Sequence, residues 1–516
     1  MKILIALLFV SSILHVHSQE EIGGFTVGGV TRFLGIPYTD GPTQRFVEGV
    51  LPASKQPFHN GTAHGPICPQ LRGSDANADE NNCLVLDIAL PEGTQSGDNL
   101  PVAIWIYGID IYEPTRFVNH SINSQEPIIF VAMNYRLNGF GFLSSEDMAA
   151  RNVLNLGLKD QRLAIKWVQK YISFFGGDST KVTLMGESAG AISIGLHVTA
   201  YGNKKDTGLF RSAIMESGGP TSLSVPPFKR TQSAYDFMIN ATDCFGKNDP
   251  FKCLQFSPFE KFIEAVRSTV NFWGQRSDSL YSPVVDKDFI PSRPSTLIKS
   301  GLYSHVPLLI GENLDEGTLF VNRSVNAFQT DQQISSILKI YGGSLTSVQR
   351  KRWLQLYPND PAVGSPYGTG NRTYYSEEYK RASSIFGDLV FVSARRFMVE
   401  QASEKSVPVW TYLFDYVTHP ELINGTSYMG VKHADELASV FQWSNKINPD
   451  LTGYWISFIN GQDPNSGAPK DTVWEQFDVR DRRQIRFSNN GTYMAADDYR
   501  IEQVHFVNSN LNQLGR

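Results

Sequence analysis

The stretch "VTLMGESAGAIS", Val182 to Ser193, constrains the fold of this chain more than any other. An apolar run ends in Gly-Glu-Ser-Ala-Gly and passes directly into small residues that suit a helix. A serine between two glycines at a strand-to-helix junction is typical of a nucleophile elbow, whose strained turn exposes the hydroxyl. Ser188 would then stand at a helix N-terminus, where the helix dipole favours developing negative charge. Gly186 and Gly190 would give the turn its room; the alternative is an ordinary strand–helix turn.

The rest of the chain is typical of an α/β protein. Six short apolar runs have the character of buried strands, and they lie at 101–108, 127–135, 181–186, 210–218, 305–313 and 407–416. Between the second and third runs, residues 155–178 repeat apolar side chains at helical spacing. This order predicts a mostly parallel, doubly wound sheet flanked by helices. We find no internal repeat or linker, so we expect residues 19–516 to form one domain.

The first 18 residues, "MKILIALLFVSSILHVHS", have the pattern of a secretory signal peptide. Lys2 supplies the positive start, Ile3 to Leu14 the apolar core, and Val16-His17-Ser18 a small-residue cleavage site. The apolar run is too short to span a membrane comfortably. With 19% charged residues and a formal net charge of −5, the composition does not favour a nucleic-acid partner. We therefore expect a soluble, secreted, extracellular protein without stable membrane insertion; its oligomeric state stays open.

Four cysteines and seven glycosylation acceptors suit an exported protein. Cys68, Cys83, Cys244 and Cys253 can pair in three ways, of which the local pairing closes two short loops. No C-x-x-C or H-x-x-x-H accompanies them, so we predict neither a metal nor a cofactor. Seven Asn-X-Ser/Thr acceptors behind a signal peptide predict glycosylation at some of them. These acceptors are Asn60, Asn119, Asn240, Asn322, Asn371, Asn424 and Asn490.

A nucleophilic serine needs a base, and the base needs an acid that orients it. In α/β-hydrolases the three follow in the order serine, acid, histidine. "GENLDEGTLF" and "MGVKHADELASVF" each follow an expected strand and place Glu316 and His433 in loops where open α/β sheets build their sites. Each alone is typical of a turn or a structural histidine; in this order after the elbow, they predict a catalytic triad. Activity should then fall on acidification through a pKa near about 6.5 for His433, which Glu316 would raise.

Several segments resemble the type-B carboxylesterase/lipase family, which includes the cholinesterases and the fungal extracellular lipases. The similarity runs from about Phe33 to Phe506, and "FGDLVFVSARRF" is most like the fungal branch. The other similar segments include "FLGIPYTDGPTQRF", "NCLVLDIALP", "NYRLNGFGFLSS", "GLKDQRLAIKWVQ", "SPVVDKDFIPSRP" and "DPNSG". The resemblance implies an α/β-hydrolase fold with no cofactor.

The resemblance also implies residue roles. Ser188 matches the family's nucleophile, Glu316 its acid and His433 its base, and the backbone N–H of Ala189 matches an oxyanion-hole donor. It further implies two local disulfides, Cys68–Cys83 and Cys244–Cys253, and a structural ion pair between Arg136 and Asp160.

One departure from the family concerns the oxyanion hole. The family runs into His/Tyr-Gly-Gly-Gly there, whereas "WIYGIDIYEPTRF" has Gly108 followed by Ile109 and Asp110. The Gly108 donor would therefore be misplaced, because glycine's conformational freedom aims these N–H groups. An inward Asp110 would also repel an oxyanion by about 3 kcal/mol at roughly 5 Å for an effective dielectric near 20. Two alternatives follow: a catalytically impaired binding protein with the esterase fold, or a sequence that lacks a segment after Gly108.

Two further departures lie near the first disulfide. Asn81-Asn82 replace the family's acidic pair, so we expect Arg45 to lack a carboxylate partner. The loop between Cys68 and Cys83 holds 14 residues and no aromatic one. It supplies neither the amphipathic lid of the lipases nor the tryptophan of the cholinesterases. We therefore predict a secreted serine carboxylesterase that hydrolyses small-molecule carboxylic esters through an acyl-serine intermediate, with the natural substrate and acyl length open.

Overall fold

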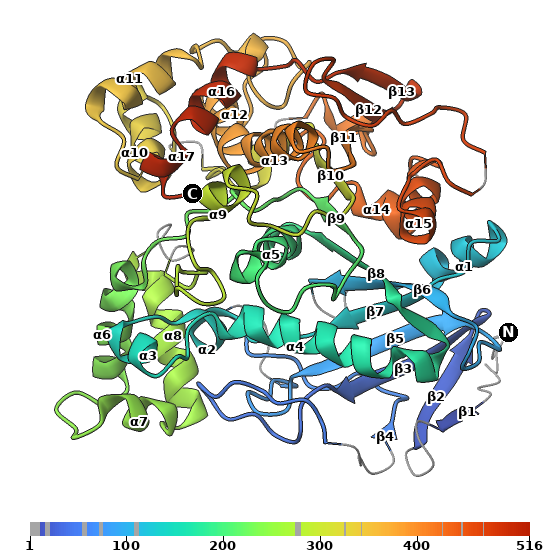
Figure 1. The fold of residues 1–516 in the computed structure, drawn as a ribbon. Helices are drawn as coiled ribbons and strands as arrows, with labels where there is room; N and C mark the ends of the chain where they lie inside the picture. The colour runs from blue at the N-terminus through green and yellow to red at the C-terminus, as the bar shows by residue number, and fades with distance from the viewer. Residues whose placement is uncertain are drawn as a thin grey trace, which may run out of the picture.

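A sheet of thirteen strands runs through the computed structural model of the chain (Figure 1). The structure describes residues 11–15, 21–53, 59–71, 76–107, 113–273, 280–324, 327–341, 343–425, 427–444, 447–467 and 469–516. The strands are β1 (Ser11–His15), β2 (Glu21–Val27), β3 (Val30–Pro37), β4 (His59–Asn60), β5 (Val85–Pro91), β6 (Leu100–Ile106), β7 (Ile129–Met133), β8 (Gly177–Glu187), β9 (Ser212–Glu216), β10 (Leu308–Asn313), β11 (Val409–Asp415), β12 (Arg483–Ser488) and β13 (Gly491–Ala496). All six strands expected from the sequence form, as β6 to β11.

The centre of the sheet is parallel and its margins are antiparallel. The spatial order is β1-β2-β3-β5-β7-β6-β8-β9-β10-β11-β12-β13, with β4 paired to β2. Every neighbouring pair from β7 to β12 is parallel, whereas β1 to β7 and β12 to β13 pair antiparallel. The predicted mostly parallel α/β class is confirmed. Parallel strands bring their carboxyl ends to one edge, which is where β8, β10 and β11 end beside the predicted site residues.

Helices cover both faces of this sheet. The helices are α1 (Thr115–Asn123), α2 (Asn138–Phe142), α3 (Glu146–Ala150), α4 (Leu156–Tyr171), α5 (Ala189–Val198), α6 (Gln232–Ala241), α7 (Pro250–Gln255), α8 (Phe259–Trp273), α9 (Pro294–Lys299), α10 (Asp331–Tyr341), α11 (Ser347–Gln355), α12 (Tyr379–Gly387), α13 (Ser393–Glu404), α14 (Leu437–Val440), α15 (Leu451–Gly461), α16 (Ile501–Ser509) and α17 (Leu511–Leu514). Helices α4, α5 and α13 pack on one face, and α1, α14 and α15 on the other (Figure 1).

Strand β6 shows why both faces need a cover. Its side chains alternate, so that Ile104 and Ile106 enter the core under α4 and α5 while Ala103 and Trp105 enter the core under α1 and α15. A strand buried on both faces reads as a continuous apolar run, as this one does. Two smaller cores lie outside these layers, one around α6 and α8 and one around α10 to α12, at the left of Figure 1.

Strand β1 lies inside the segment with the signal-peptide pattern. Its five residues pair antiparallel with β2, in the register Ser11 to Phe25. The predicted cleavage residues, Val16-His17-Ser18, lie outside the described residues. Within the described ranges, no helix is both long and apolar enough to cross a membrane.

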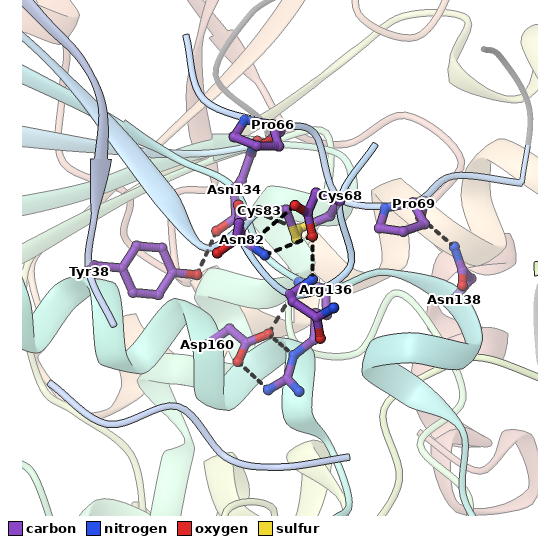
Figure 2. The surroundings of a disulfide bond; sticks show 12 residues. Tyr38, Pro66, Cys68, Pro69, Asn82, Cys83, Asn134, Arg136, Asn138 and Asp160 are labelled. Atoms are coloured by element: carbon purple, nitrogen blue, oxygen red, sulfur yellow. Dashed lines mark hydrogen bonds and ion pairs between the residues drawn. A yellow bond between two sulfur atoms is a disulfide. The ribbon is translucent and has the colours of Figure 1, made fainter. Parts of the chain in front are cut away.

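The structure pairs the cysteines locally, Cys68 with Cys83 and Cys244 with Cys253, as the resemblance implies. Beside the first disulfide lies the implied ion pair, in which Arg136 Nη2 is 2.6 Å from Asp160 Oδ1 (Figure 2). Both of these side chains are 1% exposed. Because such a pair is costly to separate once buried, it fixes the loop after β7 onto α4.

The prediction that Arg45 lacks a carboxylate partner is wrong. Its guanidinium holds Glu80 through two bonds, from Nε at 2.8 Å and from Nη2 at 2.7 Å. Glu80 directly precedes the two asparagines, so a neighbouring position supplies the acid that they do not. The guanidinium carbon also lies 4.0 Å from the ring centroid of Phe262 in α8. The first disulfide loop is thus tied to the α6–α8 core after all.

Candidate active site

Ser188 occupies a strained turn between β8 and α5. Its φ of 54° and ψ of −117° lie where few non-glycine residues are found. The backbone N–H of Ser188 donates to Glu216 O at 2.9 Å, which fixes the turn to the end of β9. The side chain is half-buried and the following Ala189 is exposed. The sequence "GESAG" therefore folds into a nucleophile elbow.

Only glycine fits at the two motif positions around the elbow. A Cβ on Gly190 would lie 1.7 Å from Ile106 O, and one on Gly186 would lie 2.8 Å from the same oxygen. Ala189 is the first residue of α5, so its N–H has no partner within the helix and is available to an anion. Gly108, Ile109 and Asp110 lie outside the described residues, and the altered oxyanion segment stays a prediction.

The side chains of Glu316 and His433 are in direct contact. Glu316 opens the short 3-10 helix η5 (Glu316–Leu319) after β10, and His433 lies in the loop between β11 and α14. His433 Nδ1 is 2.5 Å from Glu316 Oε2, and both side chains are buried. The other carboxylate oxygen of Glu316 accepts from Asn313 N–H at 2.7 Å and from Ser217 Oγ at 2.6 Å. These bonds fix Glu316, whose contact with Nδ1 in turn orients the imidazole of His433.

A second carboxylate faces the other nitrogen of His433. Nε2 lies 3.0 Å from Oε1 of Glu187, the residue that precedes Ser188. Within the described residues, Nε2 makes no hydrogen bond of good geometry, to Ser188 or to any other group. Burial alone would lower the pKa of His433, but the charges of Glu316 and Glu187 raise it to about 10. The pKa of His433 therefore lies further above 6.5 than the prediction from Glu316 alone, because Glu187 adds a second negative charge.

Two more acids, both fully buried, lie close to the Glu316–His433 pair. Glu436 accepts from Asn313 Nδ2 and lies 3.3 Å from Ser217 Oγ. Burial, and then the charges of Glu187 and Glu316, raise the pKa of Glu436 to about 8. Burial and the charge of Glu436 likewise hold the pKa of Glu216 well above its usual value.

These three acids were not predicted from the sequence, although each lies within or beside a segment that the prediction rests on. Glu187 is inside "GESAG", Glu216 is in "MESGG" ahead of Gly218, and Glu436 is in "HADEL". For Glu187 the available signal was its place immediately before the predicted nucleophile, whereas Glu216 lies at the end of an expected strand and Glu436 three residues after the predicted base. What the sequence could not supply was the direction in which each side chain points.

Aromatic rings border the imidazole. The ring centroids of Phe320 and Phe391 each lie 4.8 Å from that of His433. Phe386 stacks on Phe320 at 5.2 Å. Although it is packed in this cluster, Phe320 remains 43% exposed. An exposed apolar surface therefore lies beside the imidazole of His433.

A strained serine at a strand–helix turn, together with a buried acid–histidine pair on neighbouring strand ends, defines the α/β-hydrolase class of serine hydrolases. The chain belongs to the carboxylesterase family, whose model matches residues 16–507. It is 31% identical to the secreted triacylglycerol lipase LIP1 of Gibberella zeae, over 95% of this chain and 89% of that one. It is 32% identical to lipase 2 of Geotrichum candidum, over 97% and 95% of the two chains.

Solved structures agree with this assignment. Aspergillus niger EstA matches with a TM-score of 0.85 and 26% identity, covering 98% of this chain and 99% of its own. A pNB esterase matches with a TM-score of 0.75 and 27% identity over 96% of this chain and 99% of its own.

Proposed function

We propose that this protein is a secreted carboxylesterase that hydrolyses esters through an acyl-Ser188 intermediate. Ser188 Oγ attacks the ester carbonyl while His433 Nε2 takes its proton; that proton then leaves with the alcohol. Water, activated by the same nitrogen, releases the acid and restores the serine. The observation that carries the proposal is the 2.5 Å bond between Glu316 and His433 beside the strained Ser188 turn.

The aromatic surface beside His433 supports an ester with an apolar group. The exposed ring of Phe320 can contact a chain or aryl group placed at the imidazole, and the buried ring of Phe391 packs behind it. The short first disulfide loop, without an aromatic residue, supports a plain esterase for soluble esters. The relatives named as lipases favour a second candidate, a triacylglycerol lipase. Secretion is supported by the signal-peptide pattern and by relatives named as secreted.

The oxyanion hole is proposed to be weak. The Ala189 N–H is one donor, and the segment from Gly108 would supply the other with altered geometry. Loss of one preorganised donor typically lowers the rate about 10²- to 10³-fold. We therefore expect slow turnover of activated esters, and an increase when Ile109-Asp110 is replaced by Gly-Gly. An impaired binding protein remains the competing proposal.

Hydrolysis of p-nitrophenyl esters and labelling by a fluorophosphonate test the proposal together. Wild-type protein should hydrolyse short esters and carry the label on the Ser188 peptide, as read by mass spectrometry. Ser188→Ala should do neither. The matched control is Ser193→Ala in the same helix, which loses a 3.2 Å contact with Gln161 and should keep both activities. Folded wild-type protein that neither turns over nor labels would leave only the binding-protein proposal.

The physical state of the substrate, dissolved or emulsified, separates the two candidate enzymes. A carboxylesterase should be fastest on dissolved esters of short acids and gain nothing when the substrate forms droplets. A lipase should instead be activated by emulsified triacylglycerol. Measuring the rate on either side of the solubility limit of one ester decides between them.

A further inference from the structure

Asp315, the residue before the triad acid, joins three segments of the chain. Its carboxylate is 2% exposed. Oδ1 accepts from Ser365 Oγ at 2.7 Å and from Tyr367 N–H at 2.9 Å. Oδ2 accepts from Val431 N–H at 3.0 Å, and Asp315 N–H donates to Val431 O at 2.9 Å. Val431 is two residues from His433, so one aspartate lies beside the acid in sequence and ties down the base in space.

Further contacts hold the same two loops together. The hydroxyl of Thr318 lies 2.8 Å from Asp315 O and 2.7 Å from Met429 O. Gly430 has a φ of +70°, and a Cβ there would lie 2.1 Å from Asp315 Oδ2. The loop that carries His433 is thus docked, backbone against side chain, on the turn that carries Glu316.

We propose that Asp315 is a positioning residue that sets the Glu316–His433 geometry by clamping these two loops, an inference that rests on the proposed function. Its side-chain hydrogen bonds go to Ser365, Tyr367 and Val431, not to the imidazole. Glu316 and His433 are 117 residues apart, and the 2.5 Å bond between them requires that both loops keep their relative position. A shift of about 1 Å at a reacting centre lowers a rate about 10²-fold.

The clamp requires a carboxylate rather than an amide. All three of its partners, the Ser365 hydroxyl and the N–H groups of Tyr367 and Val431, can donate to it. An asparagine has one acceptor oxygen, so its NH₂ must face an N–H donor on one side or the other. Burial raises the pKa of Asp315 to about 6, although its hydrogen bonds and then the charge of Arg500 lower it. At pH 8 the acceptor is therefore ionised, with Lys380 as a second nearby cation.

Asp315→Asn in the full-length protein tests the clamp. We expect kcat for a p-nitrophenyl ester to fall about 10²-fold while KM changes little, because the variant alters the triad and not the substrate surface. The pKa of His433 should fall as Glu316 moves away. The other groups that face His433 are Glu187 and Glu436, and both are unchanged in this variant. Proton NMR titration, with the His433 signal assigned by its loss in His433→Gln, measures this pKa without any turnover.

Asp160→Asn is the matched control. Asp160 is 1% exposed and accepts several bonds from Arg136, away from both loops. The Asp160→Asn variant should have a lower melting temperature, while its kcat per folded molecule and the pKa of His433 stay unchanged. Thr318→Val is a second, milder variant that loosens the same two loops, with an expected fall in kcat of about fivefold.

The outcomes separate the clamp from the proposed function. If Asp315→Asn and Thr318→Val behave like Asp160→Asn, losing stability with no change in kcat or in the His433 pKa, the positioning role is overturned even though the wild type is an esterase. If the wild type lacks esterase activity, its turnover is no higher than that of Ser188→Ala, and the proposed function fails. The NMR titration then still reports whether Asp315 sets the environment of His433.

Discussion

Glu187→Gln probes the electrostatics of the site most directly. A base in ester hydrolysis must be neutral, yet the pKa of His433 is raised to about 10. At pH 8 only about one imidazole in a hundred would be neutral, since the pH lies about two units below that pKa. The rate should therefore rise with pH throughout the range from 6 to 9.

The expected shift follows from the contact being removed. Glu187 Oε1 lies 3.0 Å from His433 Nε2, and its side chain is 1% exposed, so solvent screens this pair little. The charge of a carboxylate this close contributes about 1.5–3 kcal/mol, the lower part of the effect of about 1–3 pKa units typical of an opposite charge within about 4–6 Å. At 1.36 kcal/mol per unit, the pKa of His433 should fall by about 1–2 units in Glu187→Gln. Glutamine keeps the shape and a hydrogen-bonding oxygen but not the charge.

The assay is kcat/KM for a p-nitrophenyl ester between pH 5 and 10.5, corrected for spontaneous hydrolysis. The midpoint of the rising limb should move to lower pH by about 1–2 units. Glu436→Gln is the matched control because Glu436, with a pKa of about 8, is already largely neutral below that pH. It should leave the limb below pH 8 nearly in place. An unchanged or upward midpoint in Glu187→Gln would refute the ion-pair reasoning.

Two predictions concern stability. Gly190→Ala should destabilise the fold by at least about 3 kcal/mol, because its Cβ would meet Ile106 O at 1.7 Å. The control is Gly453→Ala in α15, whose Cβ would meet nothing closer than 3.5 Å and which should stabilise the fold by about 0.5–1 kcal/mol. Urea unfolding measures both changes. The melting temperature should also fall as the pH rises from 5 to 8, because the folded state keeps a proton on Glu436 that the unfolded chain has lost. Glu436→Gln should flatten that slope, and an equally steep slope in this variant would show that other groups set it.

The elements and contacts that the sequence predicted correctly are those that local pattern encodes. Strands β6 to β11 were visible because strands buried on both faces must be continuously apolar. The elbow was visible because Gly190 packs against a backbone oxygen, where no side chain fits. The acid and the histidine were found by their order along the chain, and the structure brings Glu316 and His433 into contact.

The misses are contacts between distant segments whose side-chain directions no local pattern sets. Glu80 takes the place of the acidic pair that Asn81-Asn82 replace, because the carboxylate that Arg45 can hold with two bonds depends on where the loop turns. The sequence around Asp315 is typical of a turn, and only the structure shows that the N–H of Val431, 116 residues later, donates to its carboxylate. Glu187 directly precedes Ser188 in the sequence, but no local pattern shows that its carboxylate faces Nε2 of His433.

The two carboxylates around His433 act in opposite directions on the resting state and on the reaction. In the resting site they stabilise the imidazolium and so withhold the base at neutral pH. In the proposed mechanism, the same imidazole becomes an imidazolium when Ser188 attacks, and both carboxylates would then stabilise it in the transition state. Glu187→Gln should therefore lower the rate on the high-pH plateau even as it makes the base available at lower pH. A plateau that rises instead would mean that Glu187 only withholds the base and contributes nothing to the transition state.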